Sequence, residues 1–326
     1  MSSTNKVRTI KQIVNAIEQS EGAGARVRRS IGVMTQRKFN PFLMFDHFSS
    51  SGTNGFPEHP HRGQETITLV LHGAMAHEDF TGSKGVLYPG DLQFMTAGKG
   101  VVHSEMPIAN KDGSPTVGLQ LWVDLPDKLK DCEPRYRDLR EWEIPTVEQQ
   151  DGKLKIKVIS GKSYGVESVK DLAYTPIEYY HYTVGSGGHF KQDLDPKFNF
   201  FLYVLRGDGL VLNGGERVKQ FQNAFLSENG DHITGENKGS DEVEFILVGG
   251  EKLEQETVQY GPFVSNSSLG IQKAFMDYQY ARNGFENIKK WKTLISGGVT
   301  QDMIDGPLGG NKEAREEMKK EYLESH

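Results

Sequence analysis

The chain has 326 residues, 36% of them hydrophobic, which is long enough for two domains of ordinary size. Its formal net charge of −6 argues against general nucleic-acid binding, so no direct nucleic-acid partner is expected. The single cysteine, Cys132, excludes an intramolecular disulfide and fits a reducing compartment. The N-terminus has no apolar signal-peptide core, and no run of 18 apolar residues occurs. We therefore expect an intracellular protein with no membrane partner.

The first patterned segment, residues 7–20, is ambiguous. Ile10, Ile13, Val14 and Ile17 follow the i, i+3, i+4, i+7 spacing of a helix face. The glycine-rich turn and basic run that follow, residues 22–29, are typical of β structure. Pattern alone leaves helix and strand both open here.

From residue 41 onward the chain predicts β structure. Short apolar or alternating runs are separated by Gly and Pro, and 37 glycines favour many tight turns. The polar stretch 126–150 is the expected connection between two domains. The strands expected on either side of it are 42–45, 65–71, 74–80, 92–95 and 118–125, then 154–159, 177–184, 198–206, 209–212 and 243–249. The similar rhythm of the two halves indicates an all-β, duplicated architecture.

The C-terminal part changes character. Residues 267–284 and 285–294 have near-helical spacing of apolar side chains, with Asn283-Gly284 as the expected end of the first helix. Residues 297–326 form a charged tail in which 311–326 reads as a solvated helix with a thin apolar stripe.

Two short segments carry side chains that bind metals. His59 and His61 are two residues apart, so on a strand both imidazoles lie on one face. His103 and Glu105 repeat this spacing after a glycine-rich turn at residues 96–100. Three imidazoles and one carboxylate suit Fe(II), with Zn, Ni, Cu, Mn and Co as alternatives, and leave coordination positions open. The absence of paired thiols argues against a structural zinc site.

The order of several motifs resembles the pirin family over roughly residues 13 to 292. The motifs are Pro41–His47 (PFLMFDH), Phe56–Gly63 (FPEHPHRG), Met75–Phe80 (MAHEDF), Pro89–Gln93 (PGDLQ), His103–Pro107 (HSEMP), Gly118–Val123 (GLQLWV), Gly261–Val264 (GPFV) and Ala281–Glu286 (ARNGFE). This resemblance implies two tandem cupin (jelly-roll-type) β-barrel domains and a strand, not a helix, at residues 13–17. We expect an N-terminal metal-binding barrel at 1–140, a C-terminal barrel at 141–296 that includes helices near 267–294, and a tail at 297–326.

The resemblance also implies a site. It places one iron ion on His59, His61, His103 and Glu105 of the first barrel and none in the second. His189, which has no partner histidine two residues away, is then an ordinary histidine, and Glu65 supports the site or the fold without binding the ion.

Members of this family resemble quercetin 2,3-dioxygenases, which open the central ring of a flavonol with O2 and release carbon monoxide. On that hypothesis Glu105 is also the catalytic base, and Gln120 is a candidate pocket residue. The alternative is a redox-sensing, iron-dependent transcriptional co-regulator that binds a nuclear transcription factor, with the basic run 26–29 in its surface. A third alternative is a metal-binding protein without turnover. The expected state is a monomer in the cytoplasm, the nucleus or both.

Overall fold

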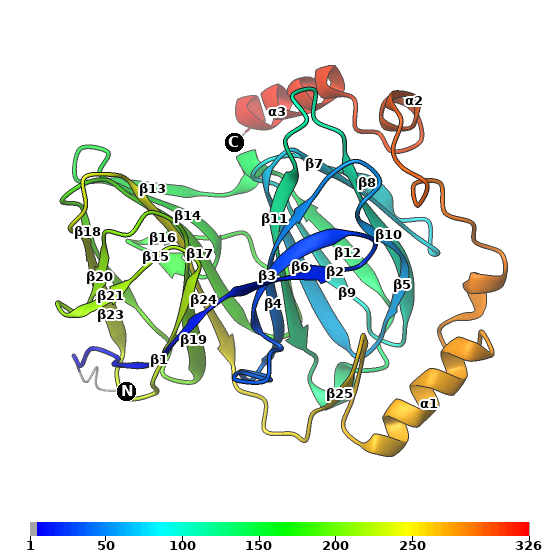
Figure 1. Ribbon diagram of the computed structural model, residues 1–326, viewed down its shortest axis with the longest axis horizontal. Helices are drawn as coiled ribbons and strands as arrows, with labels where there is room; N and C mark the ends of the chain where they lie inside the picture. Colours follow the sequence, from blue (N-terminus) through cyan, green and yellow to red (C-terminus); the bar gives the residue numbers. More distant parts are fainter. Residues whose placement is uncertain (1–4, 326) are drawn as a thin grey trace. The chain divides into compact units, whose positions relative to one another are not determined.

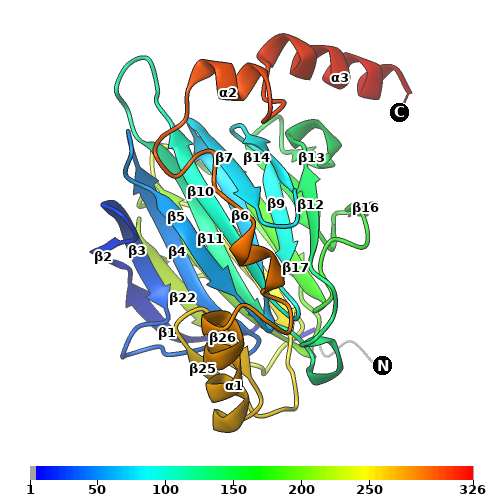
Figure 2. The same cartoon turned by 90° about the vertical axis from the view of Figure 1, so that its right-hand side faces the viewer.

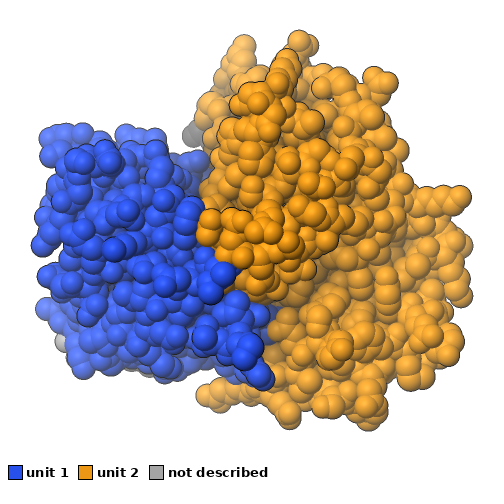
Figure 3. All heavy atoms as spheres, viewed as in Figure 1, with its two compact units in different colours: residues 1–17, 30–43, 143–253 blue, residues 18–29, 44–142, 254–326 orange. Residues whose placement is uncertain are grey.

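A computed structural model describes residues 5–325, which form two compact units (Figure 1, Figure 3). Unit 1 comprises the residues up to Ile17, Ser30–Leu43 and Glu143–Leu253. Unit 2 comprises Glu18–Arg29, Met44–Trp142 and the residues from Glu254 onward. The expected segments 1–140, 141–296 and 297–326 were contiguous in sequence, whereas these units are not. The first strand of the chain pairs within unit 1, and the C-terminal residues pack on unit 2.

Unit 2 contains a seven-stranded and a four-stranded sheet. The seven-stranded sheet has the order β12 (Arg135–Leu139), β9 (Leu92–Thr96), β6 (Gln64–His72), β11 (Thr116–Asp124), β4 (Phe42–Ser50), β3 (Ala25–Ile31) and β2 (Ile17–Glu21). The four-stranded sheet has the order β5 (Phe56–His61), β10 (Val101–Ile108), β7 (Ala74–Asp79) and β8 (Lys84–Leu87). A hairpin of β25 (Val258–Tyr260) and β26 (Phe263–Ser265) completes the β structure of this unit.

Unit 1 repeats the combination of a seven-stranded and a four-stranded sheet. The larger has the order β1 (Ile10–Asn15), β22 (Gln222–Leu226), β19 (Phe198–Arg206), β24 (Val243–Glu251), β17 (Ile177–Val184), β14 (Leu154–Ser160) and β13 (Thr146–Gln149). The smaller has the order β18 (His189–Asp193), β23 (His232–Asn237), β20 (Leu210–Leu212) and β21 (Glu216–Val218), and β15 (Lys162–Ser163) pairs with β16 (Val166–Glu167). A buried aromatic and aliphatic cluster from the larger and the smaller sheet of unit 1 fills this unit. The all-β, duplicated prediction is confirmed.

The ambiguous N-terminal segment is a strand, as the family resemblance predicted. β1 pairs antiparallel with β22, and the register shifts between Ile10 and Gln12. A bulge inserts one residue and so changes which side chains share a face. Ile10 and Ile13, three residues apart, both pack against the core of unit 1 for this reason. The helix-like spacing of the isoleucines is therefore the signature of a bulged strand.

Two other predictions need correction. Residues 126–150 are not simply a connection, since they contain β12, which pairs with β9, and β13, which pairs with β14. The unit boundary itself falls at a short 3-10 turn, Glu141–Glu143. Of the two expected helices, the first is α1 (Ser268–Gln279), and the second is only a 3-10 turn at Glu286–Lys289. Ala281 and Asn283 have positive φ, which a right-handed helix cannot contain, so α1 ends before the expected Asn283-Gly284.

The C-terminal residues lie along the outer face of the four-stranded sheet of unit 2 (Figure 2). Ile295, Ile304 and Leu308 pack against Ala76 and Met106 of that sheet. The segment contains α2 (Gln301–Asp305) and ends in α3 (Lys312–Ser325). Among the described residues no helix is long and apolar enough to cross a membrane.

The helix expected at 311–326 exists but is anchored, because Arg315 is buried against Asp91. Both guanidinium NH2 groups of Arg315 donate to the Asp91 carboxylate, each at 2.7 Å, and the ring of Trp142 lies 4.4 Å from the guanidinium carbon. Asp91 is fully buried and also accepts hydrogen bonds from Arg140 and from the backbone N–H groups of residues 88 and 141. The tail is thus part of unit 2 and not a free extension.

We expect Arg315→Ala to lower the free energy of unfolding by about 3 kcal/mol, the lower end of the range for breaking a buried ion pair. The lower end applies because Asp91 keeps its other donors. Urea unfolding of the full chain measures the change. Lys320→Ala, which removes an exposed partner of Glu324 on the same helix, is the matched control and should have no measurable effect. Equal stability of Arg315→Ala and the wild type would show that the tail is not anchored by this pair.

Candidate metal centre

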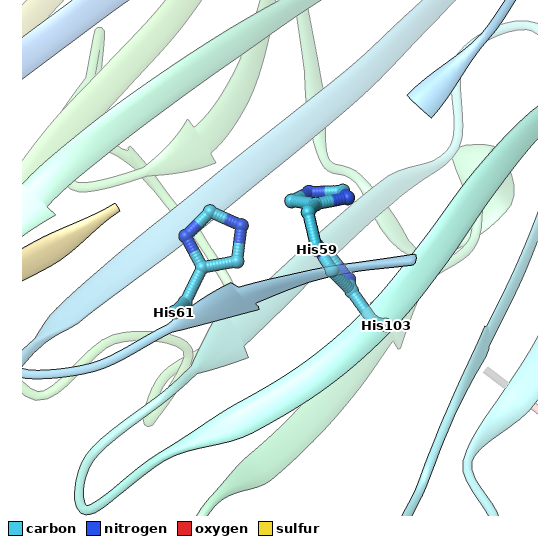
Figure 4. A group of neighbouring side chains, drawn as sticks. All are labelled: His59, His61 and His103. Carbon is cyan, nitrogen blue, oxygen red and sulfur yellow. The ribbon is translucent and has the colours of Figure 1, made fainter. Parts of the chain in front are cut away.

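Two neighbouring strands of unit 2 bring three of the predicted ligands together. His59 and His61 lie on β5, His103 lies on β10, and the antiparallel register places His103 directly opposite His59. The three imidazoles are on one side of the strand pair and face one another (Figure 4). The two-residue spacing on β5 produces this directly, because alternate side chains of a strand share a face.

The spacing of the three rings suits a common ion. One ligand nitrogen from each histidine lies within 4.8 Å of the others. The Nε2 atoms of His59 and His103 are 2.9 Å apart. Two nitrogens that bind one ion at right angles, each at about 2.0–2.1 Å, are separated by about 2.9 Å. Within the described residues this is the only group of three or more such side chains with this geometry.

Burial favours the neutral form of two of these imidazoles, His61 and His103, and a metal ligand must be neutral. Burial lowers the pKa of His61 and of His103 well below the ordinary value, and the neighbouring histidines lower it further. His59 Nδ1 lies 2.8 Å from the backbone carbonyl oxygen of Pro57. A proton on Nδ1 is donated to that carbonyl, which leaves the Nε2 lone pair directed at His103.

Glu105, the fourth predicted ligand, lies beside the three histidines but outside their group. Its Oε2 atom is 3.8 Å from His103 Nε2. The carboxylate accepts hydrogen bonds from the Thr68 hydroxyl, at 3.2 Å, and from the Gln120 side-chain amide, at 3.3 Å. A bulge between His103 and Glu105 changes the register with β5, so Glu105 lies opposite Phe56. Glu105 is therefore held by neutral donors within reach of the cluster.

The turn after β5 is fixed by contacts that no local pattern indicates. Arg62 donates to Asp277 of α1 at 2.9 Å and to the Lys99 carbonyl oxygen at 2.6 Å. Gly63 N–H donates to the Gly98 carbonyl oxygen at 2.8 Å. These bonds join the end of β5 to the turn before β10, and so fix the two histidine-bearing strands relative to each other.

The backbone of this turn requires a glycine at position 98. The substitution Gly98→Ala measures how much stability that glycine provides. Its φ is +48°, and an added Cβ would collide with the Cys132 carbonyl group. A left-handed conformation costs an alanine about 1–2 kcal/mol, and forced packing adds about 1–3 kcal/mol. We expect thermal unfolding to show a much larger loss for Gly98→Ala than for Gly113→Ala. Gly113 has a φ of +75°, and an added Cβ would lie in open space. Gly113→Ala therefore loses stability only through the left-handed backbone conformation. Equal losses at both positions would contradict the required close approach.

The other residues singled out in the sequence have simpler surroundings. Glu65 is buried and accepts a hydrogen bond from the Thr96 hydroxyl at 2.7 Å, apart from the three histidines. His189 is exposed on β18 of unit 1. The basic run is ion-paired, with Arg26 and Arg28 both bound to Glu18. Gln120, the candidate pocket residue, contacts the predicted ligand Glu105.

Three imidazoles, two of them fully buried, converge from adjacent strands of a two-sheet β unit, the architecture of a cupin-class β-barrel protein with a candidate three-histidine metal site. Residues 24–123 match the family model "Pirin", and residues 179–284 match "Pirin C-terminal cupin domain". The chain belongs to the pirin family, and the predicted tandem cupin fold is confirmed.

Known relatives agree with this assignment. The chain is 42% identical to human pirin over 281 residues, which cover 85% of this chain and 94% of the human protein. It is also 42% identical to a pirin-like protein of Arabidopsis thaliana over 307 residues, covering 91% of this chain and 97% of the relative. Among solved structures, it is similar to quercetin 2,3-dioxygenase from Acinetobacter baumannii, with a TM-score of 0.78 and 26% identity. That match covers 85% of this chain and 98% of the bacterial enzyme.

Proposed function

We propose that this protein binds one Fe(II) ion at His59, His61 and His103, with Glu105 as the fourth ligand or the adjacent base. We further propose that it catalyses a quercetin 2,3-dioxygenase-type reaction, the O2-dependent opening of a flavonol ring. Ni, Cu, Mn, Co and Zn are alternative ions, since the same ligands suit several divalent metals. The similarity to a structure named as quercetin 2,3-dioxygenase supports the choice of reaction class.

One observation carries this proposal most directly. Three imidazoles lie together with a carboxylate 3.8 Å from one of them. Buried charges and buried histidines are costly unless they are paired or bind a metal. Here His103 Nδ1 has no hydrogen-bond partner among the described residues, and its Nε2 atom faces His59 Nε2 at 2.9 Å, where the lone pairs of both nitrogens could bind one ion. A set of three protein nitrogens also leaves positions for exogenous ligands, as a catalytic site requires.

The residues around the ligands have distinct roles in this proposal. When bound, a divalent ion acts as a Lewis acid that lowers the pKa of a hydroxyl group at an open position. Glu105 accepts the proton of the flavonol 3-hydroxyl group, because it is the carboxylate next to the cluster. Thr68 and Gln120 hold the two Glu105 oxygens by donating to them, which orients the base and leaves a lone pair on each oxygen free.

The alternative co-regulator function has less support from the described surface. Its suggested basic run, residues 26–29, is matched by acidic partners. Arg26 and Arg28 pair with Glu18, and Arg29 pairs with Glu21 and Asp46. These pairs leave little uncompensated positive charge to attract an acidic partner. We therefore place the enzymatic function first.

The test is turnover by the reconstituted protein. Anaerobic loading with Fe(II), followed by quercetin and O2, should consume oxygen and release carbon monoxide. Parallel samples loaded with Ni, Cu, Mn or Co identify the most active ion. Protein that carries bound metal yet neither consumes oxygen nor releases carbon monoxide with any of these ions would contradict the proposed reaction, while leaving the metal centre intact.

A further inference from the structure

Gln64 is a fully buried residue that contacts the Nδ1 atom of His61, one of the proposed ligands. It is the first residue of β6, three positions after His61 and across the turn from it. Its side-chain nitrogen lies 2.8 Å from His61 Nδ1 and 3.2 Å from the carbonyl oxygen of Pro262. Its side-chain oxygen, Oε1, is buried and has no hydrogen-bond partner among the described residues. An orphaned buried oxygen on such a side chain requires an explanation.

The contact identifies which nitrogen of His61 is available to an ion. Nδ1 faces Gln64, so Nε2 is the nitrogen left for coordination. A neutral imidazole that coordinates through Nε2 carries its proton on Nδ1, and that N–H needs an acceptor. An amide NH2 group cannot accept it, because two donors would then face each other at 2.8 Å. The orientation with the amide nitrogen toward His61 therefore suits only the other tautomer, in which Nε2 holds the proton.

A glutamine can serve both states, since its amide presents a donor or an acceptor after a turn of 180°. With Oε1 toward His61, the orphaned oxygen gains a donor and the Nε2 lone pair is freed for the ion. This turn of the amide loses the 3.2 Å hydrogen bond that the amide nitrogen donates to the Pro262 carbonyl oxygen. Both side chains are buried, with His61 1% and Gln64 0% exposed, so no water shell compensates for a mismatched pair.

We infer that Gln64 is a positioning residue which sets the tautomer of His61 and, through it, the affinity of the metal centre. In the metal-bound state its Oε1 atom accepts the His61 Nδ1 proton. This inference rests on the proposed metal centre and concerns the binding of the ion, not the choice of substrate.

The test compares two near-isosteric variants by Zn(II) affinity, measured in competition with a chromophoric chelator. Gln64→Met removes the acceptor and should weaken binding about 10- to 100-fold, the usual loss on removing an outer partner of a ligand. Gln64→Glu retains an acceptor and cannot donate when ionised, so it should bind Zn(II) at least as tightly as the wild type. Gln93→Met is the matched control, because Gln93 is a buried glutamine of the same sheet whose amide donates to Asp138. It should retain wild-type affinity.

A direct readout is the long-range 1H–15N NMR spectrum of the Zn(II)-loaded wild type, which should show the His61 proton on Nδ1. Wild-type affinity in Gln64→Met, or affinity in Gln64→Glu as weak as in Gln64→Met, would overturn the role of Gln64. So would a His61 proton on Nε2 in the loaded protein. A wild-type chain that binds no metal would instead overturn the metal centre and this inference with it. Loss of quercetin turnover alone, with these affinities as expected, would bear only on the proposed reaction.

Discussion

His103→Ala is expected to abolish stoichiometric metal binding. His103 is central to the cluster, since its Nε2 atom lies 2.9 Å from His59 Nε2 and 3.8 Å from the Glu105 carboxylate. Removing a direct ligand should reduce affinity by more than the roughly 10- to 100-fold loss caused by an outer partner. The fold should survive, because the Nε2 contacts of His103 are to other members of the cluster, and its Nδ1 atom has no hydrogen-bond partner among the described residues. Elemental analysis after anaerobic Fe(II) loading and dialysis measures the change.

The control for this experiment is His189→Ala, which removes an exposed histidine of unit 1. It should bind the same amount of metal as the wild type. A thermal melt of the metal-free proteins verifies that His103→Ala is folded. Full metal occupancy in folded His103→Ala would show that the ion binds elsewhere in the chain.

Glu105→Gln is expected to lower the rate of quercetin oxidation by about 10²- to 10⁴-fold, the range for loss of a general acid–base group. The substitution keeps the size of the side chain and removes its ability to take a proton. Its amide oxygen can still accept from Gln120 or Thr68, so the surroundings should be retained. Oxygen uptake and carbon monoxide release by the Fe(II)-loaded variant measure the effect, normalised to bound metal. This normalisation separates the role of the base from that of a ligand.

Glu58→Gln is the matched control for Glu105→Gln. Glu58 lies on β5 next to His59 but is exposed, so its carboxylate is outside the cluster. It should leave the rate per bound metal unchanged. An unchanged rate in Glu105→Gln as well would exclude Glu105 as the base.

The sequence predicts that His59 and His61 lie side by side, because their spacing on a strand has only one structural consequence. Side chains two apart on β5 share a face, and this holds before any tertiary contact is known. The pairing of β10 with β5 cannot be predicted from spacing along one strand. It depends on the register that places His103 opposite His59, and on a bulge before Glu105 that no periodicity indicates. The distance of Glu105 from the three histidines therefore could not be predicted from residue spacing alone.

Supporting residues were missed for the same reason. Arg62 and Asp277 are separated by 215 positions, and only the folded chain brings the two together. Gln64 is close to His61 in sequence, but their contact exists because the chain reverses between β5 and β6. At the N-terminus, a bulge in β1 makes a strand look helical. At the C-terminus, α3 is so rich in charged residues that its sequence does not show that Arg315 is buried. Local pattern predicts faces of strands, whereas these contacts are made between elements distant in the chain.

We propose that one ion binds to His59, His61 and His103 of unit 2. Anomalous diffraction from a crystal of the loaded protein, recorded on both sides of the metal's absorption edge, tests it most directly. We expect one strong peak per chain, about 2.0–2.1 Å from one nitrogen of each of the three histidines. A fully loaded protein whose anomalous peak lies elsewhere, or touches none of these imidazoles, would contradict it.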